Sequence, residues 1–140
     1  SEGTTSYVTA RALAAVAGPE AGARIWARYE DRLLRAQARQ SFRVAWPPTC
    51  GVVDVERDLF TGITYMKGAF FLRALASTVG IEALDQALAA FYAEQKGRAA
   101  GMGDLLEVIA RETGYDPTEC ADAWLRSEAL PARRDACPQS

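Results

Sequence analysis

Residues 59–80 read LFTGITYMKGAFFLRALASTVG. This stretch is long enough for about six helical turns, and Lys67 and Arg73 are its only charged residues. A helix that is apolar on most of its sides belongs at the centre of a bundle. We therefore predict a buried helix over residues 59–79, ended by Gly80, with the other helices packed around it.

Helical patterns also fill most of the remaining chain. Gly18 and Pro19 separate the first two helices, because glycine favours a helix end and proline suits a first turn. The other predicted helices span residues 4–17, 19–40, 81–96, 104–113 and 116–127. The sequence thus predicts an all-α fold of about six helices in an irregular bundle, with residues 1–131 as one helical domain and 132–140 as a polar tail.

Residues 41–58 interrupt the helical pattern. The run Trp46-Pro47-Pro48 cannot continue a helix. Val52, Val53 and Val55 favour a short extended piece. A loop of this length inside a compact domain is often functional.

Composition excludes several functions. A net charge of −2 gives no electrostatic reason to expect nucleic acid or an anionic membrane as a partner, and no apolar run reaches the roughly 20 residues that a membrane-spanning helix needs. The 140 residues contain no histidine. Because histidine is the usual zinc ligand and the commonest general base, the chain cannot hold a self-contained zinc site of the usual kind or a Ser/His or Cys/His catalytic pair.

Six arginines lie between Arg24 and Arg43, mostly off the apolar stripe of the helix at 19–40. We interpret them as a solvated helix face rather than a binding surface.

The three cysteines are Cys50, Cys120 and Cys137, and their spacing matches no metal-binding motif. One interpretation is a disulfide between Cys120 and Cys137 that attaches the tail. The other is a buried thiol at Cys120 with free thiols elsewhere. The sequence leaves both open, and with them the redox compartment.

Two segments together resemble a known family. One is the start of the chain, where Glu2 and Gly3 are followed by Tyr7. The other lies in the buried helix and reads Thr64-Tyr65-Met66-Lys67-Gly68-Ala69. They are similar to the Glu-Gly and Tyr-x-Lys-Gly-Ala segments of the zinc aminopeptidases typified by aminopeptidase N, which are gluzincin metallopeptidases. The resemblance implies that this chain is the C-terminal half of a thermolysin-like catalytic domain.

The resemblance also implies roles for two residues. Glu2 matches the third zinc ligand of the family, and Tyr65 matches the tyrosine that donates a hydrogen bond to the tetrahedral oxyanion. Read without the resemblance, Tyr65 is a core tyrosine and Glu2 is a terminal glutamate. Lys67 needs a partner in an apolar helix, and we expect an acidic one. Gly68 lets another helix approach closely.

The family's His-Glu-x-x-His motif, which supplies two zinc ligands and the general base, is absent here. We therefore expect a fragment of a zinc metallopeptidase that is metal-free and inactive alone, with Glu2 disordered or exposed at its start. The expected partners are the missing N-terminal half, a peptide substrate in the parent protein, and a second copy of the chain through the exposed face. The alternative is a non-catalytic helical module, derived from a peptidase, that binds a protein or peptide.

Overall fold

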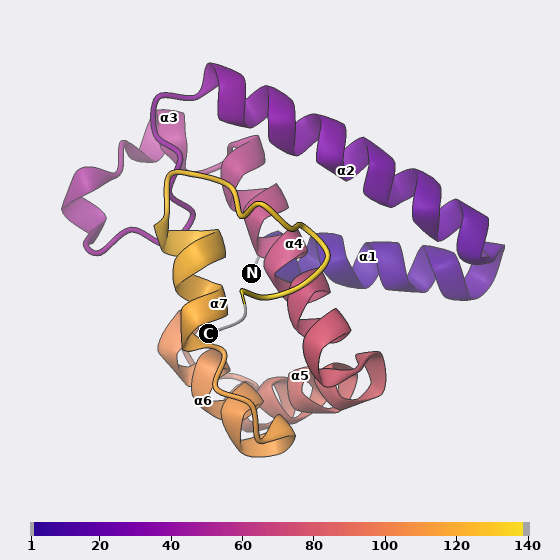
Figure 1. Cartoon of the computed structure of the whole chain (residues 1–140). Coiled ribbons are helices and arrows are strands. Elements are labelled where there is room, and N and C mark those ends of the chain that lie inside the picture. Colours follow the sequence, from indigo (N-terminus) through magenta and orange to yellow (C-terminus); the bar gives the residue numbers. More distant parts are fainter. Residues whose placement is uncertain (1, 139–140) are drawn as a thin grey trace.

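The computed structural model describes residues 2–138, and helices dominate this part of the chain (Figure 1). The long helices are α1 (Glu2–Ala17), α2 (Pro19–Arg39), α4 (Gly62–Val79), α5 (Ile81–Gln95) and α6 (Met102–Thr113). Shorter ones are α3 (Val55–Asp58) and α7 (Thr118–Ala121), which continues as a π-helical segment over Asp122–Arg126, and a 3₁₀ turn covers Cys50–Val52. No strand occurs within residues 2–138, so the predicted all-α fold is confirmed.

Helix α4 is the centre of the bundle, as its apolar sequence predicts. It packs against α1 and α2 on one side and against α5, α7 and the π-helical segment on the other (Figure 1). Along α4, Met66, Phe70 and Leu75 are completely buried. The Phe70 ring lies between two tryptophans, 5.2 Å from Trp26 of α2 and 5.7 Å from Trp124 of the π-helical segment, measured between ring centroids. These aromatic contacts join the two sides of the bundle.

The chain before α4 differs from the prediction in two ways. Helix α4 begins at Gly62 rather than at residue 59, because the Thr61 side chain accepts a hydrogen bond from the Ile63 amide and caps the helix there. The predicted extended piece is wrong for Val52 and Val55. Val52 closes a 3₁₀ turn, and Val55 begins α3, which the Asp54 side chain caps. Capping by Asp54 outweighs the weak strand preference of the valines.

The end of the chain returns to the core. Cys120 and Cys137 form a disulfide, so the first of the two interpretations of the cysteines is the one found, and Cys50 is a free, exposed thiol. Cys137 is buried, and its amide donates a hydrogen bond to the Thr78 hydroxyl of α4. Ser1 and the last two residues of the predicted polar tail lie outside the described residues. Within residues 2–138, none of the helices is long and apolar enough to cross a membrane.

Candidate functional site

Helices α1 and α4 cross at two glycines, and this crossing builds the candidate site. A Cβ atom placed on Gly3 would lie 2.4 Å from the Cα of Gly68, and one placed on Gly68 would lie 2.8 Å from the Cα of Gly3. Neither distance leaves room for a side chain. The predicted close approach at Gly68 is therefore confirmed, and it places the first turn of α1 beside the first half of α4.

Glu2 and Tyr65 meet at this crossing. The Glu2 carboxylate acts electrostatically on the Tyr65 phenol, and both side chains are half-buried. Burial raises the pKa of the Tyr65 phenol, and the nearby Glu2 carboxylate raises it further. The phenol therefore stays protonated at neutral pH and can donate a hydrogen bond. The expectation that Glu2 is disordered or exposed is wrong, because the Gly3–Gly68 contact holds the first turn of α1 in place.

Arg32 of α2 completes this group of side chains, and the sequence pattern did not assign it to the site. Its guanidinium carbon lies 4.9 Å from the centroid of the Tyr65 ring, within the range of a cation–π interaction. The positive charge of Arg32 partly opposes the increase in the pKa of Tyr65. Helical spacing places Arg32 at the edge of the apolar stripe of α2, seven residues after Ile25, but no local signal shows that it reaches Tyr65.

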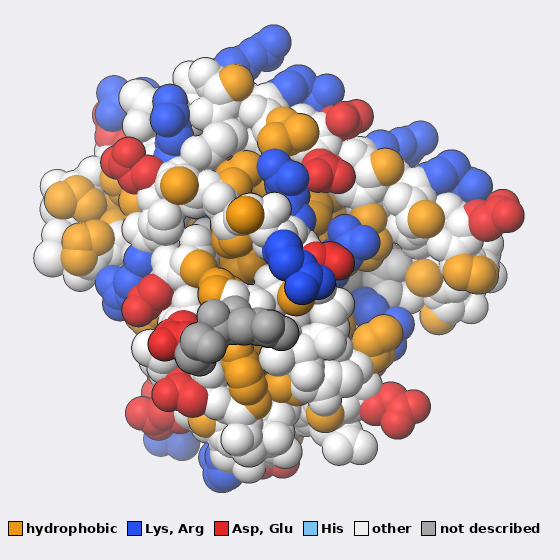
Figure 2. All heavy atoms as spheres, viewed as in Figure 1, with side chains coloured by type: hydrophobic (Ala, Val, Ile, Leu, Met, Phe, Trp, Pro, Cys, Tyr) orange, Lys and Arg blue, Asp and Glu red, His pale blue; other side chains and the backbone are white. Residues whose placement is uncertain are grey.

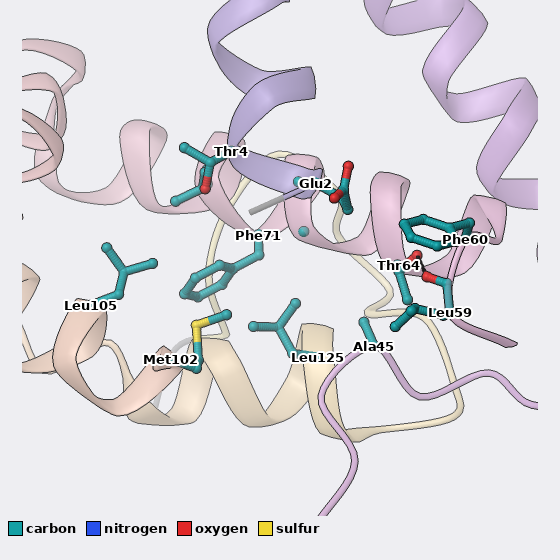
Figure 3. A pocket seen from close by; sticks show the side chains of 13 residues that line it. Glu2, Thr4, Ala45, Leu59, Phe60, Thr64, Phe71, Met102, Leu105 and Leu125 are labelled. Carbon is teal, nitrogen blue, oxygen red and sulfur yellow. Dashed lines mark hydrogen bonds between the residues drawn. The ribbon is translucent and has the colours of Figure 1, made fainter. Parts of the chain in front are cut away.

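A pocket of about 360 Å³ opens beside Glu2 (Figure 3). Glu2 and Thr4 of α1 and Thr64 of α4 bring polar groups to it. Apolar side chains form most of the rest of its lining and come from α4, α6, the π-helical segment and the loops: Ala45, Leu59, Phe60, Phe71, Leu72, Met102, Leu105 and Leu125. A mostly apolar pocket with a few polar groups is the usual form of a site for a small ligand or a peptide side chain.

Lys67 does not act as the sequence predicts. Its ammonium group is completely buried and donates to backbone carbonyls, 2.5 Å from the oxygen of Ser127 and 3.3 Å from that of Glu128. The predicted direct pairing with an acidic side chain is wrong, although the charge of Glu128 acts on Lys67 at longer range. Burial lowers the pKa of Lys67 to about 8. These hydrogen bonds attach α4 to Ser127 and Glu128, which follow the π-helical segment.

Zinc does not fit the residues of this chain alone. The sequence contains no histidine, and residues 2–138 hold no group of three histidine, cysteine or acidic side chains placed to bind a metal ion. Glu2 offers one carboxylate, whereas a catalytic zinc needs three protein ligands. A zinc site that used Glu2 would therefore draw its other ligands from outside these residues.

Comparison with known proteins identifies the family of this chain. The model of the peptidase family M1 domain matches residues 1–124. The chain is 27% identical over 111 residues to an alanine/arginine aminopeptidase of Saccharomyces cerevisiae, covering 77% of this chain and 13% of the yeast protein. It is 32% identical over 71 residues to an aminopeptidase N of Streptomyces lividans, covering 51% of this chain and 8% of that protein.

An aminopeptidase 2 of Candida albicans is 23% identical over 111 residues, covering 77% of this chain and 12% of that protein. The chain thus spans between 8% and 13% of the length of these relatives. No solved structure matches the chain. Since the family model covers most of the 140 residues, including Glu2 and Tyr65, this chain belongs to peptidase family M1.

Proposed function

We propose that this chain is the helical part of the catalytic domain of a zinc-dependent, aminopeptidase-like metallopeptidase that hydrolyses peptide bonds. The close contact between Gly3 and Gly68 carries this proposal, because it brings together Glu2 and Tyr65, the two residues to which the resemblance gives catalytic roles. Membership of peptidase family M1 and the aminopeptidase names of three relatives support it.

In this proposal Tyr65 acts on the substrate carbonyl. A protonated phenol beside the pocket donates a hydrogen bond to the oxygen that becomes negatively charged when the carbonyl is attacked. Helix α4 holds the phenol rigidly, since buried residues follow it on the same helix. Glu2 serves as one zinc ligand, and the other ligands and the general base come from outside this chain. Steps that depend on the metal are therefore not assigned to these residues.

Substitutions in the longest natural protein that contains these residues test both roles. Tyr65→Phe should lower kcat by about 10²–10³-fold, the usual cost of losing one oxyanion donor, with zinc content unchanged. Glu2→Gln should lower the zinc content measured by elemental analysis. Tyr92→Phe is the matched control, because Tyr92 is 70% exposed on α5, and it should change neither value.

Two results would contradict the proposal. Full activity of Tyr65→Phe would show that Tyr65 does not donate a hydrogen bond to the oxyanion. A natural protein without a His-Glu-x-x-His motif and without bound zinc would remove the catalytic function. Thermal unfolding of each variant separates loss of catalysis from loss of folding.

Exposed apolar residues beside the site favour a second candidate, a non-catalytic module that binds a protein or peptide. Val55 and Phe60 are 65% and 70% exposed, and a second, mostly apolar pocket of about 230 Å³ lies next to them. The same surface suits the N-terminal half of a catalytic domain or a second copy of this chain. Peptide binding without hydrolysis or zinc in the natural protein would support this candidate. A strict monomer in sedimentation equilibrium would exclude the homodimer.

A further inference from the structure

The exposed face of α2 is unusually rich in arginine. At 100° per residue, five arginines fall within an arc of about 80° and extend over about 22 Å of the helix. We call this group the arginine stripe, and it consists of Arg24, Arg28, Arg32, Arg35 and Arg39. All five side chains are exposed. Positive side chains lie along the edge of the molecule that α2 occupies (Figure 2).

Few acidic groups neutralise the arginine stripe. Arg24 lies 4.0 Å from Glu20, and among residues 2–138 the other four arginines form no ion pair. Asp31 lies at the edge of the stripe, and among residues 2–138 it forms no ion pair with it, while Glu30 points away and pairs with Arg134. The chain as a whole carries a net charge of −2. The positive potential is therefore a local property of this face.

The stripe is continuous with the candidate site through Arg32. Its guanidinium lies over the Tyr65 ring, 4.9 Å from the centroid, and its Cγ would lie 3.6 Å from a Cβ atom built on Gly62, in the first turn of α4. A ligand that approaches Tyr65 from the side of α2 therefore meets Arg32 before the phenol. An arginine without an acidic partner favours a carboxylate, which its planar group can bind through two hydrogen bonds.

The sequence pattern favours a solvated face here, but from the position of Arg32 over Tyr65 we infer that the arginine stripe is a binding surface for the carboxylate groups of a peptide. Arg32 makes the site prefer acidic peptides over neutral ones. The identification of this peptide as a substrate rests on the proposed function. The carboxylates belong either to aspartate and glutamate side chains or to the peptide's C-terminus. An extended peptide of about seven residues matches the 22 Å length of the stripe, at about 3.3 Å per residue.

The test measures binding to this 140-residue chain and needs no hydrolysis. Three heptapeptides carry the same neutral dye. One contains alternating alanine and glutamate with an amidated C-terminus. The second has glutamine in place of glutamate, and the third is the second with a free C-terminal carboxylate. Fluorescence anisotropy should show tighter binding of the first or the third peptide than of the second. Tighter binding of the first peptide assigns the contact to glutamate side chains, and tighter binding of the third assigns it to the C-terminal carboxylate. This preference should fall as salt rises from 50 to 300 mM, because the charges are exposed.

Variants that remove positive charges show which arginines cause the preference for acidic peptides. Arg32→Gln should weaken binding of the preferred peptide about threefold, as expected for an exposed ion pair. A fourfold variant that also carries Arg28→Gln, Arg35→Gln and Arg39→Gln should abolish the preference. Arg98→Gln removes the same charge from the exposed loop between α5 and α6, and it should have no effect. Equal effects of Arg32→Gln and Arg98→Gln, or equal affinity for all three peptides, would overturn the inference.

Amide chemical shifts decide whether the peptide reaches the site. Addition of the preferred peptide should move the signals of Gly62, next to Arg32, and of Gly68, next to Glu2, and leave that of Gly103 in α6 unchanged. Shifts confined to α2 would overturn the role of Arg32 in the site. Because these measurements involve no catalysis, an inactive natural protein would contradict the proposed function without affecting this result.

Discussion

Gly3 of α1 and Gly68 of α4 touch through their backbones, and this contact holds Glu2 against Tyr65. A methyl group on Gly3 would lie 2.4 Å from the Cα of Gly68 and 2.9 Å from the amide nitrogen of Ala69. Backbone atoms cannot move aside as the end of a flexible side chain can. Two residues without side chains thus fix the distance between the helices that carry the proposed site.

Gly3→Ala should therefore destabilise the chain by about 2 kcal/mol, because the added methyl group forces α1 away from α4. Urea unfolding followed by circular dichroism measures the change. Gly103→Ala is the control, since nothing lies within 4 Å of a Cβ atom at this position in α6, and it should cost no stability. Unchanged stability of Gly3→Ala would mean that the two helices do not cross as described.

The disulfide between Cys120 and Cys137 should contribute about 3 kcal/mol to the free energy of unfolding, given the 17 residues that separate the two cysteines. Cys137→Ser should lower the urea midpoint accordingly. Cys50→Ser changes an exposed free thiol and should leave the midpoint unchanged. Since both bonded cysteines are buried, a mild reductant should act slowly on the folded chain, and rapid reduction would contradict this burial.

Lys67 should make stability depend on pH. Burial lowers its pKa in the folded chain to about 8, whereas the ordinary value is 10.5. Between these values the unfolded chain binds more protons than the folded chain, so the free energy of unfolding rises with pH. From pH 8 to 10 we expect an increase on the order of 1–2 kcal/mol. Lys67→Met should abolish this increase. Urea unfolding at several pH values, in a Cys50→Ser background that prevents thiol exchange, measures the change. The same dependence of stability on pH with and without Lys67→Met would refute the prediction.

Thr61 should determine where α4 begins. Its hydroxyl accepts a hydrogen bond from the Ile63 amide at 3.2 Å, and the side chain is buried. Thr61→Ala should cost about 1 kcal/mol and lower Tm by a few degrees in calorimetry. Thr61→Ser keeps the oxygen and should retain most of the stability. If serine and alanine lowered Tm equally, packing of the threonine methyl group, and not the cap, would explain the loss.

Local patterns predicted much of the fold. The apolar run at 59–79 identified the central helix, and Gly80, with a φ of 95°, ends it as predicted. The pattern missed α3 and the start of α4, because side-chain caps at Asp54 and Thr61 decide both. Such caps depend on single hydrogen bonds, which outweigh the weak intrinsic preferences of the surrounding residues.

The features of the candidate site also fall into those that the sequence predicted and those that only the tertiary structure decided. The sequence alone determined that α4 is apolar and carries Tyr65, that Gly68 permits a close approach, and that the chain lacks histidine. The tertiary structure alone decided that Glu2 reaches Tyr65, that Arg32 covers its ring, and that Lys67 contacts carbonyls instead of an acid. The physical reason is distance along the chain. Helical periodicity is set by neighbours within one or two turns, whereas these contacts depend on which helix faces pack against each other.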